Sequence, residues 1–300
     1  MKRLFIALLS LAALTFTACN TNNPDGPVPD SFPKKHLIEE FTGQGCGYCP
    51  YGMNCISDFT ANDTNFIVIL HHYGYKQDHF TVSGSKTITN TLGVNGAPSM
   101  TIDRAKTKTE KGSQTVFHPV YLPTTDKAQF ATTTYASVEI ENNYDAVNRQ
   151  LNIKVSGALA TQDHPALFLT VLVKESGMVD YQSDYYYSFE GWEEFRHTNA
   201  VRAFLTDAKG DEVSVKKNRY STEYTLVLDE NWVAENCMVV AFLSEEFKPV
   251  VQAAEKPAVA GTKGGADIEH GGIKAVPVSD FYPEPSATTA PKDYSGVDAD

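Results

Sequence analysis

Hydrophobic positions in the first half of the chain alternate between two spacings, which indicates that strands and helices alternate there. Residues 66–71 form a continuous apolar run, typical of a strand that is covered on both faces. In residues 46–62 the apolar positions recur at steps of three and four, which predicts a helix. We also expect strands at residues 36–41 and 99–103, and helices at residues 83–92 and 126–135.

After residue 136 the period of the hydrophobic pattern changes to two. Leu151, Ile153 and Val155 alternate with polar residues, as on a strand with one buried face. Further apolar strands are expected at residues 167–173, 200–205, 224–228 and 237–243. About 120 residues of such strands predict an all-β, immunoglobulin-like sandwich domain. We therefore expect an α/β domain over residues 34–135 and a sandwich domain over residues 136–257.

Both ends of the chain lack the pattern of a folded domain. Lys2 and Arg3 precede an apolar stretch at residues 4–16 that is too short to span a bilayer, which predicts an export signal. We assign the signal peptide to residues 1–18, a flexible tether to residues 19–33 and a flexible acidic tail to residues 258–300.

Cys19 stands where the predicted export signal would be cut. A cysteine at this point resembles the bacterial lipobox, which implies that Cys19 is acylated and anchors the protein to a membrane without a transmembrane helix. Asn20 replaces the aspartate that retains lipoproteins in the inner membrane of enteric bacteria, so we expect the outer membrane, on its periplasmic face or at the cell surface. The alternative is an ordinary signal peptide that contains a cysteine.

The charge of the chain argues against one class of partner. The sequence has 25 Lys and Arg against 37 Asp and Glu, a net charge of −12 at pH 7. A negative field repels phosphate backbones, so we expect no nucleic-acid partner.

The strongest chemical signal is Cys46-Gly47-Tyr48-Cys49, between a predicted strand and a predicted helix. Two thiols at this spacing can close a small disulfide ring, and helix amides aimed at the first sulfur lower the pKa of its thiol. We expect Cys46 to be the exposed nucleophile and Cys49 the resolving thiol. Pro50 fits the first helical turn, where the backbone amides have no intrahelical partner.

Two further features accompany this motif. Glu40 lies six residues before Cys46 at the end of the preceding strand, and Ala97-Pro98 lies directly before the predicted strand at residues 99–103. This order resembles the thioredoxin superfamily over residues 34–130, and the CGYC motif is similar to that of periplasmic disulfide isomerases. The resemblance implies that Glu40 takes the proton of the resolving thiol. It also implies that a cis Pro98, with Ala97 and Tyr48, contacts the substrate backbone.

The rest of the chain is similar to the Bacteroidetes outer membrane protein 28 family over residues 34–257. The similarity rests on residues 40–43 running into Cys-x-x-Cys-Pro, on residues 197–202 and on Leu205-Thr206. It implies a lipoprotein with a thioredoxin-like first half and a β-rich second half. The expected fold is thus an α/β thioredoxin-like domain followed by an all-β immunoglobulin-like sandwich domain.

Other interpretations of the cysteines remain open. Cys46 and Cys49 could bind zinc with Cys55 or the His71-His72 pair, although zinc usually takes four ligands and adjacent strand residues point to opposite faces. They could also form a purely structural disulfide. Cys55 and Cys237 are most simply buried small side chains, and a bridge between them is an alternative.

A dense aromatic segment at residues 181–195 stands out in the second half. It contains Tyr181, Tyr185, Tyr186, Tyr187, Phe189, Trp192 and Phe195. It could form a recognition patch for a protein or glycan, or a lid over the open end of the sandwich, which we favour.

Two functional hypotheses follow. The first is thiol–disulfide exchange with thiols or disulfides of envelope proteins, without an organic cofactor or metal, because the two thiols supply the electrons. The alternative is a surface lipoprotein, an adhesin or complex subunit, that binds a protein or glycan through residues 181–195 and carries a redox-inert scaffold.

Overall fold

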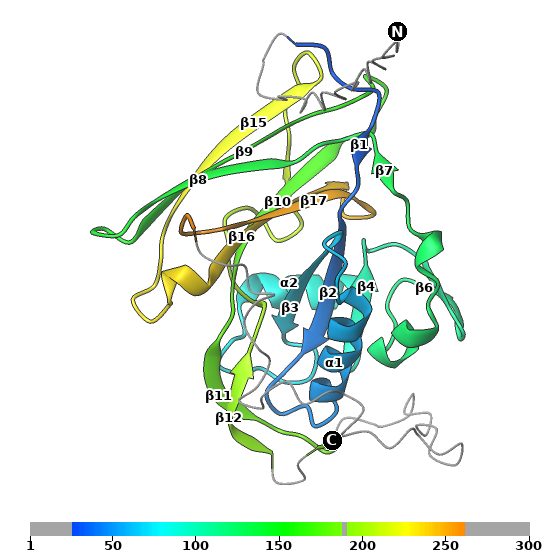
Figure 1. Ribbon diagram of the computed structural model, residues 1–300, viewed down its shortest axis with the longest axis vertical. Helices are drawn as coiled ribbons and strands as arrows, with labels where there is room; N and C mark the ends of the chain where they lie inside the picture. The colour runs from blue at the N-terminus through cyan, green and yellow to red at the C-terminus, as the bar shows by residue number, and fades with distance from the viewer. Residues whose placement is uncertain (1–25, 188–190, 262–300) are drawn as a thin grey trace, which may run out of the picture.

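The computed structural model describes residues 26–187 and 191–261 (Figure 1). The predicted signal peptide, Cys19, Phe189 and residues 262–300 of the predicted tail lie outside these ranges. Within the described part of the chain, no helix is both long and apolar enough to cross a membrane.

The centre of the molecule is a mixed sheet of eight strands. Seven of them follow the order β17-β16-β10-β13-β3-β2-β4, and β14 pairs with β10. The strands are β2 (His36–Thr42), β3 (Phe66–His72), β4 (Ser99–Ile102), β10 (Leu167–Glu175), β13 (Ala200–Phe204), β14 (Asp211–Glu212), β16 (Cys237–Glu245) and β17 (Val250–Pro257).

The predicted fold class, a thioredoxin-like α/β domain followed by a separate sandwich, is wrong. Strands hold 44% of the described residues and helices only 15%, and strands from both halves share the central sheet. β2 pairs in parallel with one edge of β3, and β13 occupies the other edge through Leu70 and Ala200. A buried strand needs partners for the backbone groups on both edges, and the second partner here comes from the far half of the chain.

Two helices accompany the strands of the first half, α1 (Cys49–Thr60) and α2 (Ser83–Leu92). The expected helix at residues 83–92 is confirmed at both ends. α1 starts three residues later than expected, because residues 46–48 form a turn that is closed by Cys49 N donating to Cys46 O (3.3 Å). Residues 126–135 do not form the expected helix: the short 3₁₀ turn η2 (Lys127–Gln129), capped by Asp126, is followed by β7 (Thr133–Thr134).

A second sheet covers one face of the central sheet and lies at the top of Figure 1. It has the order β15-β9-β8, formed by β8 (Glu139–Asp145), β9 (Gln150–Ala158) and β15 (Arg219–Val227). The alternation predicted for Leu151, Ile153 and Val155 is confirmed, since all three are buried in the core between the sheets. β10 is apolar on both sides because Val171 faces this core while Leu172 belongs to a second core with Leu37 and Ile67.

Smaller elements complete the fold. They are β1 (Phe32–Pro33), paired with β7; β5 (Thr107–Thr109) and β6 (Gly112–Gln114), paired together; and the 3₁₀ turns η1 (Pro119–Thr124) and η3 (Ala234–Asn236). The hairpin of β11 (Met178–Gln182) and β12 (Trp192–His197) extends away from the second sheet toward the end of the molecule where α1 lies (Figure 1). This hairpin carries the aromatic segment to the CGYC motif.

Candidate functional site

Cys46 and Cys49 form a disulfide at the point where the chain leaves β2 and enters α1. Their Cα atoms are 5.4 Å apart. Two successive turns produce this approach: Cys46 N donates to Gly43 O (3.0 Å) and Cys49 N donates to Cys46 O (3.3 Å). Pro50 occupies the first turn of α1, as expected, where no intrahelical hydrogen bond is lost.

Glu40 lies on β2, next to the helix that carries Cys49. Its side chain is fully buried, and neither carboxyl oxygen has a hydrogen-bond partner within the described residues. Burial raises the pKa of Glu40 well above its ordinary value and so favours the protonated form of the carboxyl group. A neutral carboxylic acid in this position can act as a proton donor.

Gly52 marks the point where α1 meets Glu40 and Pro98. A Cβ atom added to Gly52 would lie 2.8 Å from Pro98 Cβ and 3.2 Å from Glu40 Oε1. The Ala97–Pro98 peptide bond is cis, and Ala97 packs against the apolar cluster that contains both cysteines. Glu40 and Pro98 therefore both border α1 at Gly52, three residues after Cys49, and we refer to Cys46, Cys49, Glu40 and Pro98 as the disulfide cluster.

Cys46 is not exposed, contrary to expectation: only 4% of its surface is accessible, and Cys49 is fully buried. Residues 181–187, which we call the strap, cover the CGYC loop. Two backbone amides of the strap donate to the loop, Ser183 N to Gln44 O (2.7 Å) and Tyr185 N to Gly47 O (2.7 Å). The lid that we expected over the open end of the sandwich thus lies over the disulfide instead.

Side chains strengthen this cover. Gln182 Nε2 donates to the Cys46 carbonyl oxygen (3.0 Å). The Tyr185 ring lies so close to Gly47 that an added Cβ there would be 2.4 Å from it. Tyr185 also meets Tyr48 edge-on, with ring centroids 5.5 Å apart, and Tyr48 remains 39% exposed at the margin of the cover.

The outer half of the strap packs along α1. Tyr186 stacks on Tyr51, with ring centroids 4.7 Å apart, and Asn54 Nδ2 donates to the Tyr187 hydroxyl (2.8 Å). The strap therefore follows both the CGYC loop and the first turns of the helix.

Asp184 gives the strap its shape. Its Oδ1 accepts from the backbone amides of Tyr186 (2.8 Å) and Tyr187 (3.0 Å), and its Oδ2 accepts from Trp192 Nε1 (2.7 Å). Our sequence analysis did not single out Asp184 or Gln182. The local turn at Asp184 has a sequence signal, because aspartate commonly accepts from amides two and three residues ahead. The contact between Gln182 and Cys46 has no such signal.

A buried pair of imidazoles, His72 and His197, lies beside the strap. Their ring centroids are 5.6 Å apart. His197 Nε2 bonds to Tyr181 O (3.2 Å), and burial lowers the pKa of His197 to about 4, so the ring is neutral at pH 7. Three buried atoms here have no partner among the described residues: His197 Nδ1, His72 Nε2 and Gln182 Oε1. The strap is thus closed over polar groups that are incompletely hydrogen-bonded.

The remaining two cysteines among the described residues are free thiols. Cys55 and Cys237 are both buried and free, so the bridge between them that we considered is not formed. Burial raises the pKa of Cys55 to about 11 and that of Cys237 to about 12. Across residues 26–187 and 191–261, no group of three or more His, Cys, Asp or Glu side chains is arranged to hold a metal ion.

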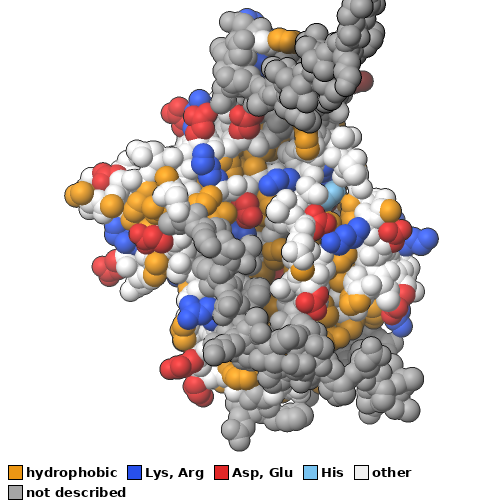
Figure 2. All heavy atoms as spheres, viewed as in Figure 1, with side chains coloured by type: hydrophobic (Ala, Val, Ile, Leu, Met, Phe, Trp, Pro, Cys, Tyr) orange, Lys and Arg blue, Asp and Glu red, His pale blue; other side chains and the backbone are white. Residues whose placement is uncertain are grey.

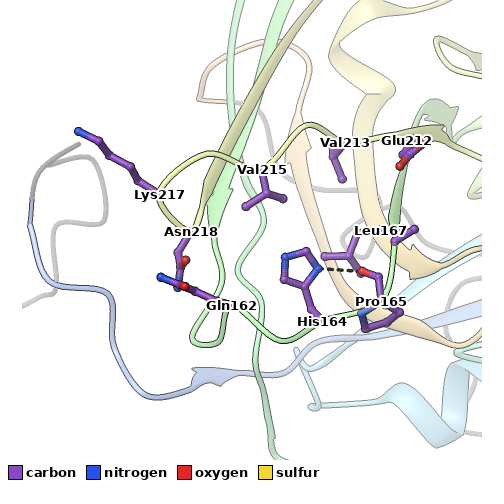
Figure 3. Close-up of a pocket in the computed structure, with 10 residues that line it drawn as sticks. Gln162, His164, Pro165, Leu167, Glu212, Val213, Val215, Lys217 and Asn218 are labelled. Carbon is purple, nitrogen blue, oxygen red and sulfur yellow. Dashed lines mark hydrogen bonds between the residues drawn. The ribbon is translucent and has the colours of Figure 1, made fainter.

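The surface offers a pocket of about 460 Å³ far along the chain from the disulfide cluster, in the loops of residues 162–167 and 212–218 (Figure 3). Inside it, His164 Nδ1 is held against Pro165 O (2.8 Å), and Lys217 points away from the other lining side chains. No residue of the disulfide cluster lines it. On the face shown in Figure 2, basic and acidic side chains are interspersed. Neither feature presents a group prepared for chemistry.

Comparison with known proteins identifies the family. The model of the family "Outer membrane protein Omp28" matches residues 85–262, so the chain belongs to the Omp28 family. The outer-membrane location predicted from the N-terminus is thereby confirmed. The matched region begins after Cys49 and does not include the CGYC motif.

Two solved structures are similar to this chain, and the first shows a related fold. HBP35 of Porphyromonas gingivalis is similar over 83% of this chain and 81% of its own, with a TM-score of 0.64 and 20% sequence identity. A domain of the outer membrane lipoprotein Omp28 from Porphyromonas gingivalis matches 41% of this chain and 86% of its own, with 17% identity and a TM-score of 0.28. No curated protein sequence matches significantly.

Proposed function

We propose that this outer-membrane protein exchanges disulfides with other proteins of the cell envelope through Cys46 and Cys49. The observation that carries the proposal is the buried, unpartnered carboxyl of Glu40 beside the helix turn that follows the disulfide. A disulfide that served only as a staple would need no ionisable group there, and burying one without a partner is unfavourable. Strongly perturbed carboxyl groups concentrate at sites of proton transfer.

The exchange starts with the disulfide seen in the structure. A client thiolate attacks Cys46 Sγ, the Cys46–Cys49 bond breaks, and its electron pair moves to Cys49 Sγ. Glu40 donates its proton to the Cys49 thiolate. A second client thiolate then attacks the client sulfur of the mixed disulfide and releases Cys46 as a thiolate, which takes up a proton from water. The client dithiol is oxidised to a disulfide, and the Cys46–Cys49 pair is reduced to two thiols.

The roles of the other predicted residues follow from this sequence of steps. Cys46 is the attacked sulfur because Cys49 is fully buried. We assign contact with the client chain to Tyr48, Ala97 and Pro98, and the packing of Ala97 against the cluster that contains both cysteines supports this assignment. A lipid anchor on Cys19 would keep the site beside envelope proteins.

The test is the reduction potential of the Cys46–Cys49 pair in the mature protein, equilibrated against glutathione buffers. Exchange catalysts lie between about −120 and −270 mV, whereas structural disulfides lie below about −300 mV. A reduction potential in the range of exchange catalysts supports exchange. The Cys49→Ala variant should then trap client proteins as mixed disulfides on Cys46. The Cys46→Ser/Cys49→Ala double variant is the control for trapping. A potential below about −300 mV would show that the bridge is a staple.

A second candidate function is binding of a protein or glycan partner, favoured by exposed aromatic side chains around the same loop. Tyr185 is 51% exposed and Tyr75, which borders Gly45, is 52% exposed. Such rings are common anchors of recognition surfaces. Under this hypothesis, Tyr75→Ala with Tyr185→Ala abolishes binding to envelope partners and Cys46→Ser leaves it intact. The opposite pattern would exclude it.

A further inference from the structure

We propose that the strap, residues 181–187, is an internal competitor of the client. It occupies the place of a client segment, must leave before Cys46 exchanges, and indicates that clients present aromatic side chains from a chain bent in the same way. This inference rests on the proposed exchange at Cys46 and Cys49.

The first argument is access to sulfur. An attacking thiolate must approach Cys46 Sγ roughly in line with the bond to Cys49. With Cys46 only 4% exposed and Cys49 fully buried, a protein thiol cannot make that approach while the strap is closed. The strap is held on the loop at two points in its middle, by Ser183 N to Gln44 O and by Tyr185 N to Gly47 O. Exchange with a protein therefore requires the strap to move.

The second argument is the kind of contact that the strap makes. Its two amides bond to backbone carbonyl oxygens of the CGYC loop, and any extended polypeptide carries such amides. Selectivity comes from the rings: Tyr185 covers the bare backbone of Gly47, and Tyr186 stacks on Tyr51. A client segment with aromatic side chains at the same positions would reproduce these contacts once the strap has moved.

Gln182 gives the strap an attachment that depends on one side chain. Its Nε2 lies within hydrogen-bond distance of the carbonyl oxygens of Cys46 (3.0 Å), Gly43 (3.3 Å) and Ser183 (3.0 Å). Removal of this amide weakens the closed state without changing the cysteines, Glu40 or Pro98. It is therefore the residue at which closure can be tested separately from chemistry.

The strap is also attached in a way that permits opening. It belongs to the hairpin of β11 and β12, a separate two-stranded sheet, and isolated two-stranded hairpins are marginally stable. The closed state buries three polar atoms without partners among the described residues, on His72, His197 and Gln182. Such groups lower the stability of the closed state relative to an opened one, in which water can reach them.

The experiment compares full-length wild-type protein with Gln182→Ala and Tyr185→Ala. We measure the rate at which dithiothreitol, and then a reduced unfolded protein, reduces the Cys46–Cys49 bond. We expect both variants to react roughly tenfold faster. Gln182→Ala loses about one hydrogen bond to the loop, and Tyr185→Ala loses the packing of its ring against Gly47 while its backbone amide is kept. Gln252→Ala is the matched control, because Gln252 is equally buried and donates to Pro33 O and Ala136 O away from the strap. We expect it to react at the wild-type rate.

A peptide tests the client class. The acetylated heptapeptide Tyr-Gln-Ser-Asp-Tyr-Tyr-Tyr, identical to residues 181–187, should slow reduction of the Gln182→Ala variant. A version with alanine in place of its last three tyrosines should not. Equal protection by the two peptides, or none, would overturn the aromatic client.

The outcomes separate the two proposals. Unchanged rates in both strap variants, with an exchange-competent reduction potential, would overturn the strap as a barrier and leave exchange standing. Faster reduction by dithiothreitol, together with a reduction potential in the range of structural disulfides and no client exchange, would overturn the proposed function instead.

Discussion

Glu39 and Glu40 are neighbours on β2, and both are fully buried, yet their surroundings differ on the two faces of the sheet. Glu39 receives two hydrogen bonds from Arg104, at 2.7 and 2.9 Å, and one contact from His71 at 3.1 Å. Although burial raises the pKa of Glu39, these partners outweigh it and lower the pKa to about 2. Glu40 has no such partner, and its pKa is raised well above the ordinary value.

The comparison shows that burial alone does not decide the charge of a carboxyl group. On the Glu39 face, the Glu39–Arg104 ion pair also holds the Arg104 guanidinium over two aromatic rings. Its Cζ atom lies 4.3 Å from the ring centroid of Phe247 and 5.0 Å from that of Phe242, which joins β2 to the last strands of the sheet. The buried carboxylate on that face has hydrogen-bond partners, and its ion pair with Arg104 stabilises the fold. On the Glu40 face, burial without a partner among the described residues favours the neutral carboxyl group beside α1, at a cost to stability.

The largest effect is expected on the satisfied face. Arg104→Ala leaves the Glu39 carboxylate buried without its cation, so we expect the free energy of unfolding to fall by about 3–5 kcal/mol. Urea unfolding of the mature protein measures it. The Glu39→Gln/Arg104→Met double variant, which removes both charges, should recover most of the loss. A loss below about 1 kcal/mol for Arg104→Ala would contradict our account of this face.

On the other face of the sheet, replacing Glu40 should change stability and activity in opposite directions. We expect Glu40→Leu to raise the free energy of unfolding by about 1–3 kcal/mol, because an unsatisfied buried polar group is removed. It should slow client exchange about 100-fold, since the acid that protonates Cys49 is lost. Unfolding and exchange are measured on the same samples. If the variant is destabilised, or exchanges at the wild-type rate, Glu40 is not the proton donor.

The pH dependence of stability sharpens the contrast. Folded Glu40 keeps its proton above its ordinary pKa of 4.5, where the unfolded chain has lost it, so its contribution to stability falls as pH rises. The contribution of Glu39 depends on pH in the opposite direction. Between pH 4.5 and about pH 2 the folded state keeps the Glu39 carboxylate ionised while the unfolded chain takes up a proton, so this contribution to stability falls as the pH drops through that range.

Glu40→Gln isolates the first of these effects. The advantage of Glu40→Gln over wild type in the free energy of unfolding should grow as the pH rises above 4.5, the ordinary pKa of the carboxyl group. Urea unfolding at several pH values measures this difference. A constant difference over that range would show that folded Glu40 titrates as it does in the unfolded chain.

The smallest effect is expected at Cys55, which lies on the same helix as Cys49. Its thiol has a pKa raised to about 11, so little thiolate forms at neutral pH. Cys55→Ala should leave both the exchange rate and the reduction potential of the Cys46–Cys49 pair unchanged. A marked loss of exchange in this variant would assign Cys55 a part in the reaction.

Much of the local structure could be predicted because it is encoded locally. The helix at residues 83–92 and the alternation of Leu151, Ile153 and Val155 follow from side-chain periodicity, which reflects the backbone conformation of the segment itself. The Cys46–Cys49 bond likewise needs only two turns of adjacent chain. The incorrect helix prediction at residues 126–135 shows the limit of periodicity. The hydrophobic pattern there is weak, and the segment instead forms a short 3₁₀ turn that is capped by Asp126.

What the sequence determined by itself is therefore the type of most elements, the disulfide and, through its motifs, the Omp28 family. The tertiary structure decided the pairing of β13 with β3, the position of the strap and the different states of Glu39 and Glu40. Each of these depends on contacts between segments far apart in the chain. Periodicity indicates which face of a segment is apolar, but it does not predict which distant backbone or charged group will contact that face.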